Sequence, residues 1–306
     1  MTFKKLFAFG LVAAVLGACG DDSSSNSATN SDEDSSSSVC EDCDGSSSSK
    51  AKSSSSSAKS SSSSAKSSNS VASSSSVLEG YVDPSTVVKG TMTDERDGQS
   101  YKTVKIGTQT WMAENLNYAY TGVPYKFVDN ESKEYTSDST SLCYNNDPSN
   151  CTKYGRLYTW AAAMDSAGFW SVNGMGCGYY KICMPTYPVR GVCPEGWHMP
   201  SKDEWGELLN FVGQLGATGS VLKSTVGWKD SEDGSGNGYD SFGFSAIPAG
   251  KGSPYDGKGF AALFWSSSTN NGDMYSFRVN LCHNYYYHFL DLAGRDWAYS
   301  VRCVKD

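Results

Sequence analysis

The position of the aromatic residues determines where this chain can build a folded core. All 8 Trp and all 19 Tyr of the 306 residues lie at or after Tyr81. Aromatic side chains bury the most apolar surface per residue, so we expect the core to form beyond that point. Residues 81–306 are long enough for one domain with a substantial core, and no linker-like stretch interrupts them.

The segment before the aromatic region has the composition of a tether. Residues 23–76 are more than half serine, with Ala-Lys-Ser recurring at Ala51, Ala58 and Ala65. Such a stretch has too little apolar surface to offset the entropy cost of ordering it. We expect a flexible linker whose ends lie on the order of 40 Å apart by random-coil scaling.

The first residues have the pattern of a secretory signal peptide. Lys4 and Lys5 precede an apolar run over residues 6–16, which is too short to span a bilayer. The following Leu16-Gly17-Ala18-Cys19 resembles the lipobox of bacterial lipoproteins. This resemblance implies that residues 1–18 are removed and that Cys19 is lipidated. The mature chain would then consist of a linker over residues 19–80 and a folded domain over residues 81–306.

The lipobox also implies a location. Acyl chains on Cys19 would attach the protein to a membrane. Asp21 and Asp22 follow closely and resemble the export signals of surface lipoproteins. We therefore expect an outer-membrane lipoprotein that is exposed on the cell surface, and an ordinary signal peptide with a chance cysteine is the alternative.

Charge argues against one class of partner. The formal net charge is −8, and residues 81–306 contain no run of Lys and Arg. Nucleic-acid binding depends on neutralising phosphates, so we do not expect a nucleic-acid partner.

Local patterns in the domain predict a mixed α+β fold. Asp97-Gly98 is typical of a hairpin turn before the alternating residues 101–106. Helices are predicted over residues 155–167 and 201–213, the second with a capping box between Ser201 and Glu204. Strands are predicted over residues 243–248, 261–266, 274–281 and 299–304. Together they suggest two helices packed on a twisted, mostly antiparallel sheet with long loops.

Several motifs resemble a known family, the Fibrobacter succinogenes major paralogous domain. The motifs, in chain order, are Val104-Lys105-Ile106-Gly107-Thr108-Gln109-Thr110-Trp111-Met112-Ala113-Glu114-Asn115-Leu116, Tyr154-Gly155-Arg156-Leu157-Tyr158-Thr159-Trp160, Cys193-Pro194-Glu195-Gly196-Trp197-His198-Met199-Pro200, Gly243-Phe244-Ser245-Ala246, Phe264-Trp265-Ser266-Ser267-Ser268 and Ser300-Val301-Arg302-Cys303-Val304. The family occurs on exported, often lipid-anchored proteins and carries no established activity. Its layout is similar to the C-type-lectin-like fold, which formylglycine-generating enzymes share.

Export makes disulfides the expected state of the cysteines. Cys143 with Cys151, and Cys177 with Cys183, can each close a short loop. The lectin-like resemblance implies that a helix-side cysteine joins the C-terminal strand, which pairs Cys193 with Cys303 and leaves Cys282 over. In the tether, Cys40 and Cys43 form either a local disulfide or a link between chains.

The sequence offers little sign of catalysis. The three histidines, His198, His283 and His288, do not have metal-site spacing, and no nucleophile elbow or phosphate-binding glycine loop is present. No cysteines match the copper-binding pair of formylglycine-generating enzymes convincingly. We therefore expect a non-catalytic protein, with an exported enzyme related to those factors as an alternative.

Two features suggest ligand binding. The loop over residues 230–240 offers oxygen ligands for calcium, although not with EF-hand spacing, and a solvated turn is the alternative interpretation. Exposed aromatics could stack on sugar rings, although core packing is the alternative. The candidate calcium ligands are Asp230, Asp233, Asn237 and Asp240, and the candidate sugar-stacking residues are Trp228, Tyr285, Tyr286 and Tyr287.

These observations lead to a first functional hypothesis and two alternatives. The first is a surface module that binds a glycan or another cell-surface or extracellular partner, with no cofactor other than calcium. The second is the exported enzyme named above. The third is a structural envelope protein crosslinked through Cys40, Cys43 or Cys282.

Overall fold

The computed structural model describes residues 84–121, 125–128, 134–137, 141–213, 218–232, 234–252, 254–284 and 288–306. The predicted signal peptide, the lipidation site Cys19 and the tether with Cys40 and Cys43 lie outside the described residues. No helix in the described ranges has the length and apolar content needed to cross a bilayer.

One sheet joins the beginning of the domain to its end. Its strand order is β1-β2-β3-β13-β8, and all neighbours are antiparallel. The predicted hairpin is present between β1 and β2, with Gly98 at a positive φ of 74° that favours glycine. The strands are β1 (Val88–Thr93), β2 (Ser100–Ile106), β3 (Gln109–Met112), β8 (Trp197–His198) and β13 (Val304–Lys305).

The second sheet has the order β11-β10-β9-β12-β7-β6 and is antiparallel except between β12 and β9. A separate two-stranded sheet pairs β4 (Tyr125–Val128) with β5 (Glu134–Ser137). The remaining strands are β6 (Ser141–Leu142), β7 (Leu157–Thr159), β9 (Ala261–Thr269), β10 (Tyr275–Cys282), β11 (His288–Gly294) and β12 (Ala298–Ser300).

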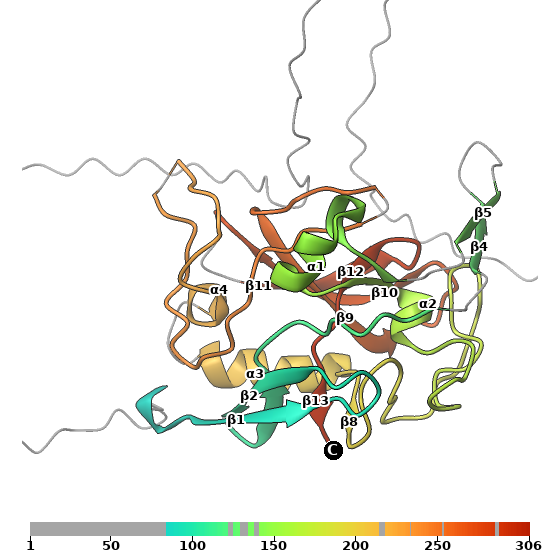
Figure 1. The fold of residues 1–306 in the computed structure, drawn as a ribbon, viewed down its shortest axis with the longest axis horizontal. Coiled ribbons are helices and arrows are strands. Elements are labelled where there is room, and N and C mark those ends of the chain that lie inside the picture. Colours follow the sequence, from blue (N-terminus) through green and yellow to red (C-terminus); the bar gives the residue numbers. More distant parts are fainter. Residues whose placement is uncertain are drawn as a thin grey trace, which may run out of the picture. The chain divides into compact units, whose positions relative to one another are not determined.

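The longest helix, α3 (Lys202–Gly213), runs between the two larger sheets (Figure 1). The predicted capping box is confirmed, since Ser201 Oγ accepts from Glu204 N and Glu204 Oε2 accepts from Ser201 N. The Trp205 ring packs against Trp111 of β3 and Phe264 of β9, at centroid distances of 4.6 and 5.6 Å. The other described helices are the short α-helices α1 (Pro148–Tyr154), α2 (Trp160–Ala163) and α4 (Thr218–Leu222), and two 3-10 helices over Pro84–Thr86 and Tyr144–Asn146.

The fold class is therefore α+β, as predicted, but with four α-helices and two larger sheets among the described residues. The strand predicted over 299–304 is interrupted, because its two ends belong to β12 and β13 in different sheets. Two other local predictions were wrong. The helix predicted over 155–167 is instead β7 followed by the single turn of α2, because residues 157–159 pair with β12. No strand forms over residues 243–248. In this segment only Ala246 forms a bridge, through backbone hydrogen bonds with Leu222 and Ser224 at the end of α4. Tertiary pairing overrides the local pattern in both cases.

The three disulfides suggested by the sequence are present in the described part of the chain. Cys143–Cys151 and Cys177–Cys183 close short loops, whereas Cys193–Cys303 joins residues 110 positions apart. Cys282 is buried and is also disulfide-bonded, so it is not the leftover thiol that the odd count suggested.

The guanidinium of Arg302 is fully buried and bonds to three distant residues. Its Nε donates to Asn115 Oδ1 at 2.9 Å, and its two terminal nitrogens donate to the carbonyl oxygens of Phe244 and Ser245. The group lies over the rings of Phe244 and Phe264, at 4.4 and 5.2 Å from their centroids. Arg302 thus connects the C-terminal segment to the segment after β3, at Asn115, and to the loop that contains Phe244 and Ser245.

Asn115 extends this cluster to a third segment. Its Nδ2 donates to the carbonyl oxygen of Tyr154 and to Ser300 Oγ, at 2.9 and 3.1 Å. Gly155 follows Tyr154 with a φ of 74°, and a Cβ there would lie 2.7 Å from Asn115 Cβ. The close approach therefore requires glycine at this position.

Removing the long disulfide should destabilise the domain more than removing a short one. Loop-closure entropy gives about 5 kcal/mol for the Cys193–Cys303 separation and about 2.5 kcal/mol for Cys143–Cys151. We expect the paired Cys193→Ala/Cys303→Ala variant to lose about 2 kcal/mol more unfolding free energy in urea than Cys143→Ala/Cys151→Ala. Equal losses would contradict this prediction.

Asn115→Ala should cost about 2–4 kcal/mol of unfolding free energy. It removes three hydrogen bonds and leaves the buried Nε of Arg302 and the carbonyl of Tyr154 without those partners. Asn210→Ala, on the exposed face of α3, is the control and should change stability by less than about 0.5 kcal/mol in the same urea titration. Similar losses for the two variants would show that the Arg302 cluster carries little stability.

Candidate functional site

Two of the residues predicted to hold calcium accept hydrogen bonds from residues that flank the loop. Asp240 accepts hydrogen bonds from the backbone N–H and the hydroxyl of Ser245, and Asn237 Oδ1 accepts from Trp228 N. Asp230 is exposed, and Asp233 lies outside the described residues. Within the described ranges no three His, Cys, Asp or Glu side chains come close enough to hold a metal ion. The described members of the predicted site are therefore not gathered around a common point.

The predicted sugar-stacking residue Trp228 is a core residue. Only 5% of its surface is exposed, and its indole N–H donates to Ser224 Oγ and to the carbonyl oxygen of Ala246. Its ring therefore has no open face for a ligand, which corrects the prediction. Tyr285, Tyr286 and Tyr287 fall outside the described residues.

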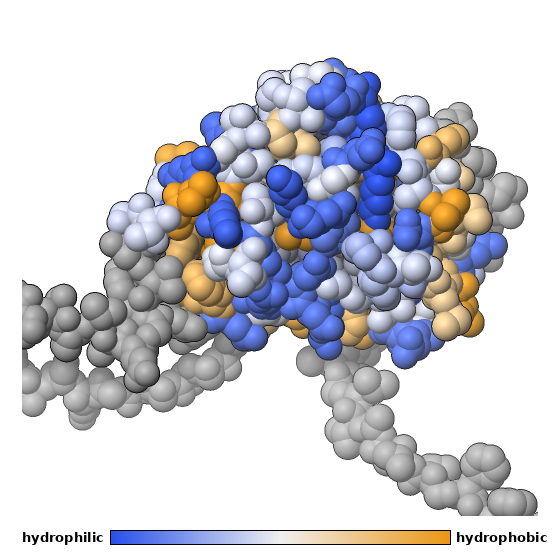
Figure 2. All heavy atoms as spheres, turned by 90° about the horizontal axis from the view of Figure 1, so that it is seen from below, coloured by the Kyte–Doolittle hydropathy of each residue, from blue (hydrophilic) through white to orange (hydrophobic). Residues whose placement is uncertain are grey.

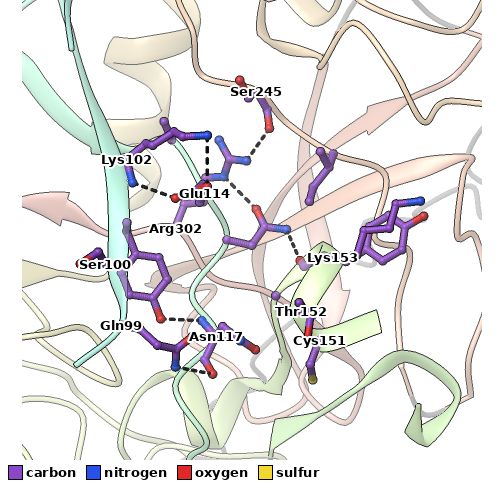
Figure 3. Close-up of a pocket in the computed structure, with 16 residues that line it drawn as sticks. Gln99, Ser100, Lys102, Glu114, Asn117, Cys151, Thr152, Lys153, Ser245 and Arg302 are labelled. Carbon is purple, nitrogen blue, oxygen red and sulfur yellow. Dashed lines mark hydrogen bonds and ion pairs between the residues drawn. The ribbon is translucent and has the colours of Figure 1, made fainter. Parts of the chain in front are cut away.

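A polar cavity of about 310 Å³ lies beside the Arg302 cluster (Figure 3). Its side chains are largely engaged with one another: Lys102 Nζ lies 3.6 Å from Glu114 Oε1, and Asn117 Nδ2 donates to Gln99 Oε1 at 3.0 Å. Asn117 Oδ1 is buried and accepts no hydrogen bond. The cavity has room for waters or one small polar molecule.

A groove of about 1020 Å³ is the larger hollow. Four segments far apart in the sequence form it: residues 183–188, residues 198–204, the ends of β9 and β10, and Asp306. Tyr187 and Phe277 supply aromatic surface, and half of Tyr187 is exposed. Lys202 Nζ lies 4.7 Å from the centroid of the Phe277 ring. The polar side chains in the lining include Asp203, Glu204, Asn271 and Asp306.

His198 connects the walls of this groove. Its Nε2 lies 2.6 Å from Glu204 Oε1 and its Nδ1 lies 2.7 Å from Asp306 Oδ1. Both ring nitrogens therefore face carboxylates, and the imidazole ties β8 to α3 and to the residue after β13. This arrangement leaves neither nitrogen available as a metal ligand or general base, so His198 holds the groove in shape.

These contacts shift the pKa of each partner. Burial alone would lower the pKa of His198, but the hydrogen bonds and charges of Glu204 and Asp306 outweigh it and raise the pKa above its ordinary 6.5. Burial would likewise raise the pKa of Glu204, but hydrogen bonds from His198 and Ser201 lower it below 4.5. His198 therefore stays protonated, and Glu204 ionised, over a wider pH range than either would in water.

Comparison with known proteins identifies the domain. A family model described as the Fibrobacter succinogenes major domain matches residues 104–305. The chain belongs to this family. No curated protein and no solved structure matches it.

In this Fibrobacter succinogenes major domain, the motifs that carry the family resemblance bond mainly to one another. Trp160 Nε1 donates to the carbonyl oxygen of Ser266, and Trp265 Nε1 donates to that of Tyr158. Arg302 joins its own motif to two others, one through Asn115 and one through Phe244 and Ser245. These motifs therefore build the scaffold.

Cys177 and Cys183 are bonded to each other, so neither is a thiolate. The groove residues Tyr187, Phe277 and Asp306 were not predicted. Ser201 and Glu204 had a local signal as the predicted capping box, and His198 lies just before it.

Replacing His198 should change how stability depends on pH. A raised folded-state pKa means that the stabilisation by protonated His198 is complete below pH 6.5 and is lost as pH rises through the folded pKa. We expect the difference in unfolding free energy between wild type and His198→Gln to be constant below pH 6.5 and to shrink above it.

Urea unfolding between about pH 5 and about pH 9 measures this difference. His283 and His288 have pKa values lowered by burial, and both remain in the variant, so their titration cancels in the comparison. A stability difference that stays constant or grows above pH 6.5 would contradict the proposed charge state of His198.

Proposed function

We propose that this chain is a lipid-anchored surface protein whose domain binds carbohydrate in the groove between residues 183–188 and the start of α3. One observation carries the proposal: partly exposed aromatic rings and carboxylates line the same groove. A sugar ring has apolar C–H faces and a rim of hydroxyls. Aromatic surface suits those faces, and carboxylate and amide groups suit the rim.

The charge and size of the groove support this ligand class. Asp203, Glu204 and Asp306 bring acidic groups, and Lys202 and protonated His198 balance part of their charge. A neutral, polyhydroxylated ligand therefore meets many hydrogen-bonding groups without strong repulsion. A volume of about 1020 Å³ is larger than one sugar ring requires, which favours an oligosaccharide segment over a monosaccharide.

The wider context is part of the same proposal. The mature chain begins at lipidated Cys19 on the outer membrane, and the tether up to residue 80 carries the domain at the cell surface. The architecture is a C-type-lectin-like arrangement, supported by Cys193–Cys303 joining the segment before α3 to the last strands. The pairing of β3 with β13 also supports this, because it brings the first and last parts of the domain into one sheet.

Removing the aromatic surface should weaken retention on glycans. Tyr187→Ala and Phe277→Ala each remove a ring from the groove, with an expected cost of about 1–2 kcal/mol, or roughly five- to thirtyfold in Kd. The measurement is a glycan array followed by pull-down on insoluble cellulose, chitin and peptidoglycan, with and without added calcium.

Tyr239→Ala is the matched control, because Tyr239 is 68% exposed and does not line the groove. It should bind like the wild type. The proposal fails if the wild type is retained on none of the glycans, or if Tyr187→Ala and Tyr239→Ala bind equally well.

A further inference from the structure

The segment over residues 166–194, here called the apolar loop, differs in charge from the rest of the domain. No Asp or Glu occurs between Asp165 and Glu195, whereas Lys181 and Arg190 are both basic. The loop is therefore cationic in a chain whose formal charge is −8.

The same loop exposes large apolar side chains. Val172, Ile182 and Met184 are 72%, 76% and 94% exposed. Phe169, Met175, Tyr180 and Tyr187 are each at least half exposed. Figure 2 shows hydrophobic side chains at the right-hand edge of the face, on the side where this loop lies in Figure 1, and others at the left-hand edge. Such a concentration marks an interaction surface, because scattered single residues would need no explanation.

The start of the loop is held in place by Asp165, which is fully buried. Its carboxylate accepts hydrogen bonds from the backbone N–H groups of Phe169, Trp170 and Ser171, at 3.0, 2.6 and 2.9 Å. It also accepts from the hydroxyl of Tyr120 at 2.5 Å. Phe169 and Val172 are therefore displayed from a turn whose backbone is fixed.

The middle and end of the loop are fixed as well. The buried Arg295 donates from one terminal nitrogen to the carbonyl oxygens of Gly178 and Lys181, at 3.2 and 2.9 Å. The Cys177–Cys183 disulfide closes the loop around these contacts. Arg190 then donates to the carbonyl oxygens of Trp170 and Cys193. Ile182 and Met184 thus point outward from a preorganised loop, which reduces the entropy cost of docking.

We propose that the apolar loop docks on the surface of an anionic phospholipid bilayer. Its most exposed side chains are aliphatic, and aliphatic chains match acyl tails, whereas planar rings match sugars. The exposed Lys181 suits anionic headgroups, which attract Lys and Arg near a bilayer surface, whereas Arg190 is engaged inside the loop. A second copy of the chain fits less well, because a two-fold contact would bring two cationic loops together.

The inference does not require the groove to bind carbohydrate. Residues 183–188 belong to both surfaces, but each surface also has residues of its own, so the two can be tested separately. Val172 and Ile182 belong to the loop and do not line the groove, whereas Phe277 lines the groove and lies outside the loop. A variant of each kind therefore reports on one surface only.

The experiment is co-sedimentation with vesicles of phosphatidylglycerol or of phosphatidylcholine. It uses the full mature chain with Cys19→Ser, so that no acyl group contributes. We expect the protein to bind phosphatidylglycerol vesicles. Its affinity for phosphatidylcholine vesicles should be at least tenfold lower. Val172→Asp/Ile182→Asp should lower the phosphatidylglycerol affinity at least tenfold, whereas Val226→Asp, at an exposed site outside the loop, and Phe277→Ala should leave it unchanged.

Near-ultraviolet circular dichroism of each variant should match the wild type, and the double variant should keep any retention on glycans. Absence of vesicle binding by the wild type would overturn the proposal. So would equal binding by the double variant, or an equal loss in Val226→Asp. Light scattering that shows a dimer abolished by Val172→Asp/Ile182→Asp, without vesicle binding, would assign the loop to self-association and likewise overturn it.

Discussion

The meeting of three distant segments of the fold depends on satisfying the buried positive charge of Arg302. Arg302 has no exposed surface, and burial lowers its pKa to about 9, so the guanidinium remains charged at neutral pH. It must therefore find acceptors inside the protein, because an unpaired buried charge is strongly destabilising. Asn115 and the carbonyl oxygens of Phe244 and Ser245 supply them. Their positions bring the end of the chain, the segment after β3 and the loop after α4 together.

The residues around Arg302 belong to the scaffold of the domain and are largely distinct from those that line the candidate binding site. The family motifs lie around Arg302 and around the tryptophans that bond across the second sheet. The groove and the apolar loop are formed mostly by other segments, over residues 166–188 and at the ends of β9 and β10. The His198–Glu204 contact connects the scaffold to the groove. His198 belongs to a family motif, Glu204 belongs to the capping box of α3, and together they form part of a groove wall. Ligand preference can therefore vary through the loops while the scaffold stays intact.

The sequence predicted the elements whose signals are local. The Asp97-Gly98 hairpin and the capped α3 depend on turn and capping chemistry within a few residues, and the structure has both. The helix expected over 155–167 failed because the pairing of Leu157 with Ser300 is not visible in its own sequence. The strand expected over 243–248 failed because its carbonyls serve Arg302, which lies some sixty positions later.

The candidate site was less predictable for the same reason. Tyr187, Phe277 and Asp306 meet only after the chain has folded, whereas Trp228 looked exposed from its polar neighbours and is buried. The apolar loop did have a signal, because an acid-free stretch in an acidic chain is visible in the sequence alone.

The central claim is that ligand binding belongs to the groove and not to the motif cluster beside the polar cavity. Chemical-shift mapping of the labelled mature chain, titrated with an oligosaccharide retained in the glycan screen, tests this claim directly. The account predicts shifts concentrated at Tyr187, Lys202, Asn271 and Phe277. Shifts centred instead on Lys102, Asn117 and Lys153, around the cavity of Figure 3, would contradict it.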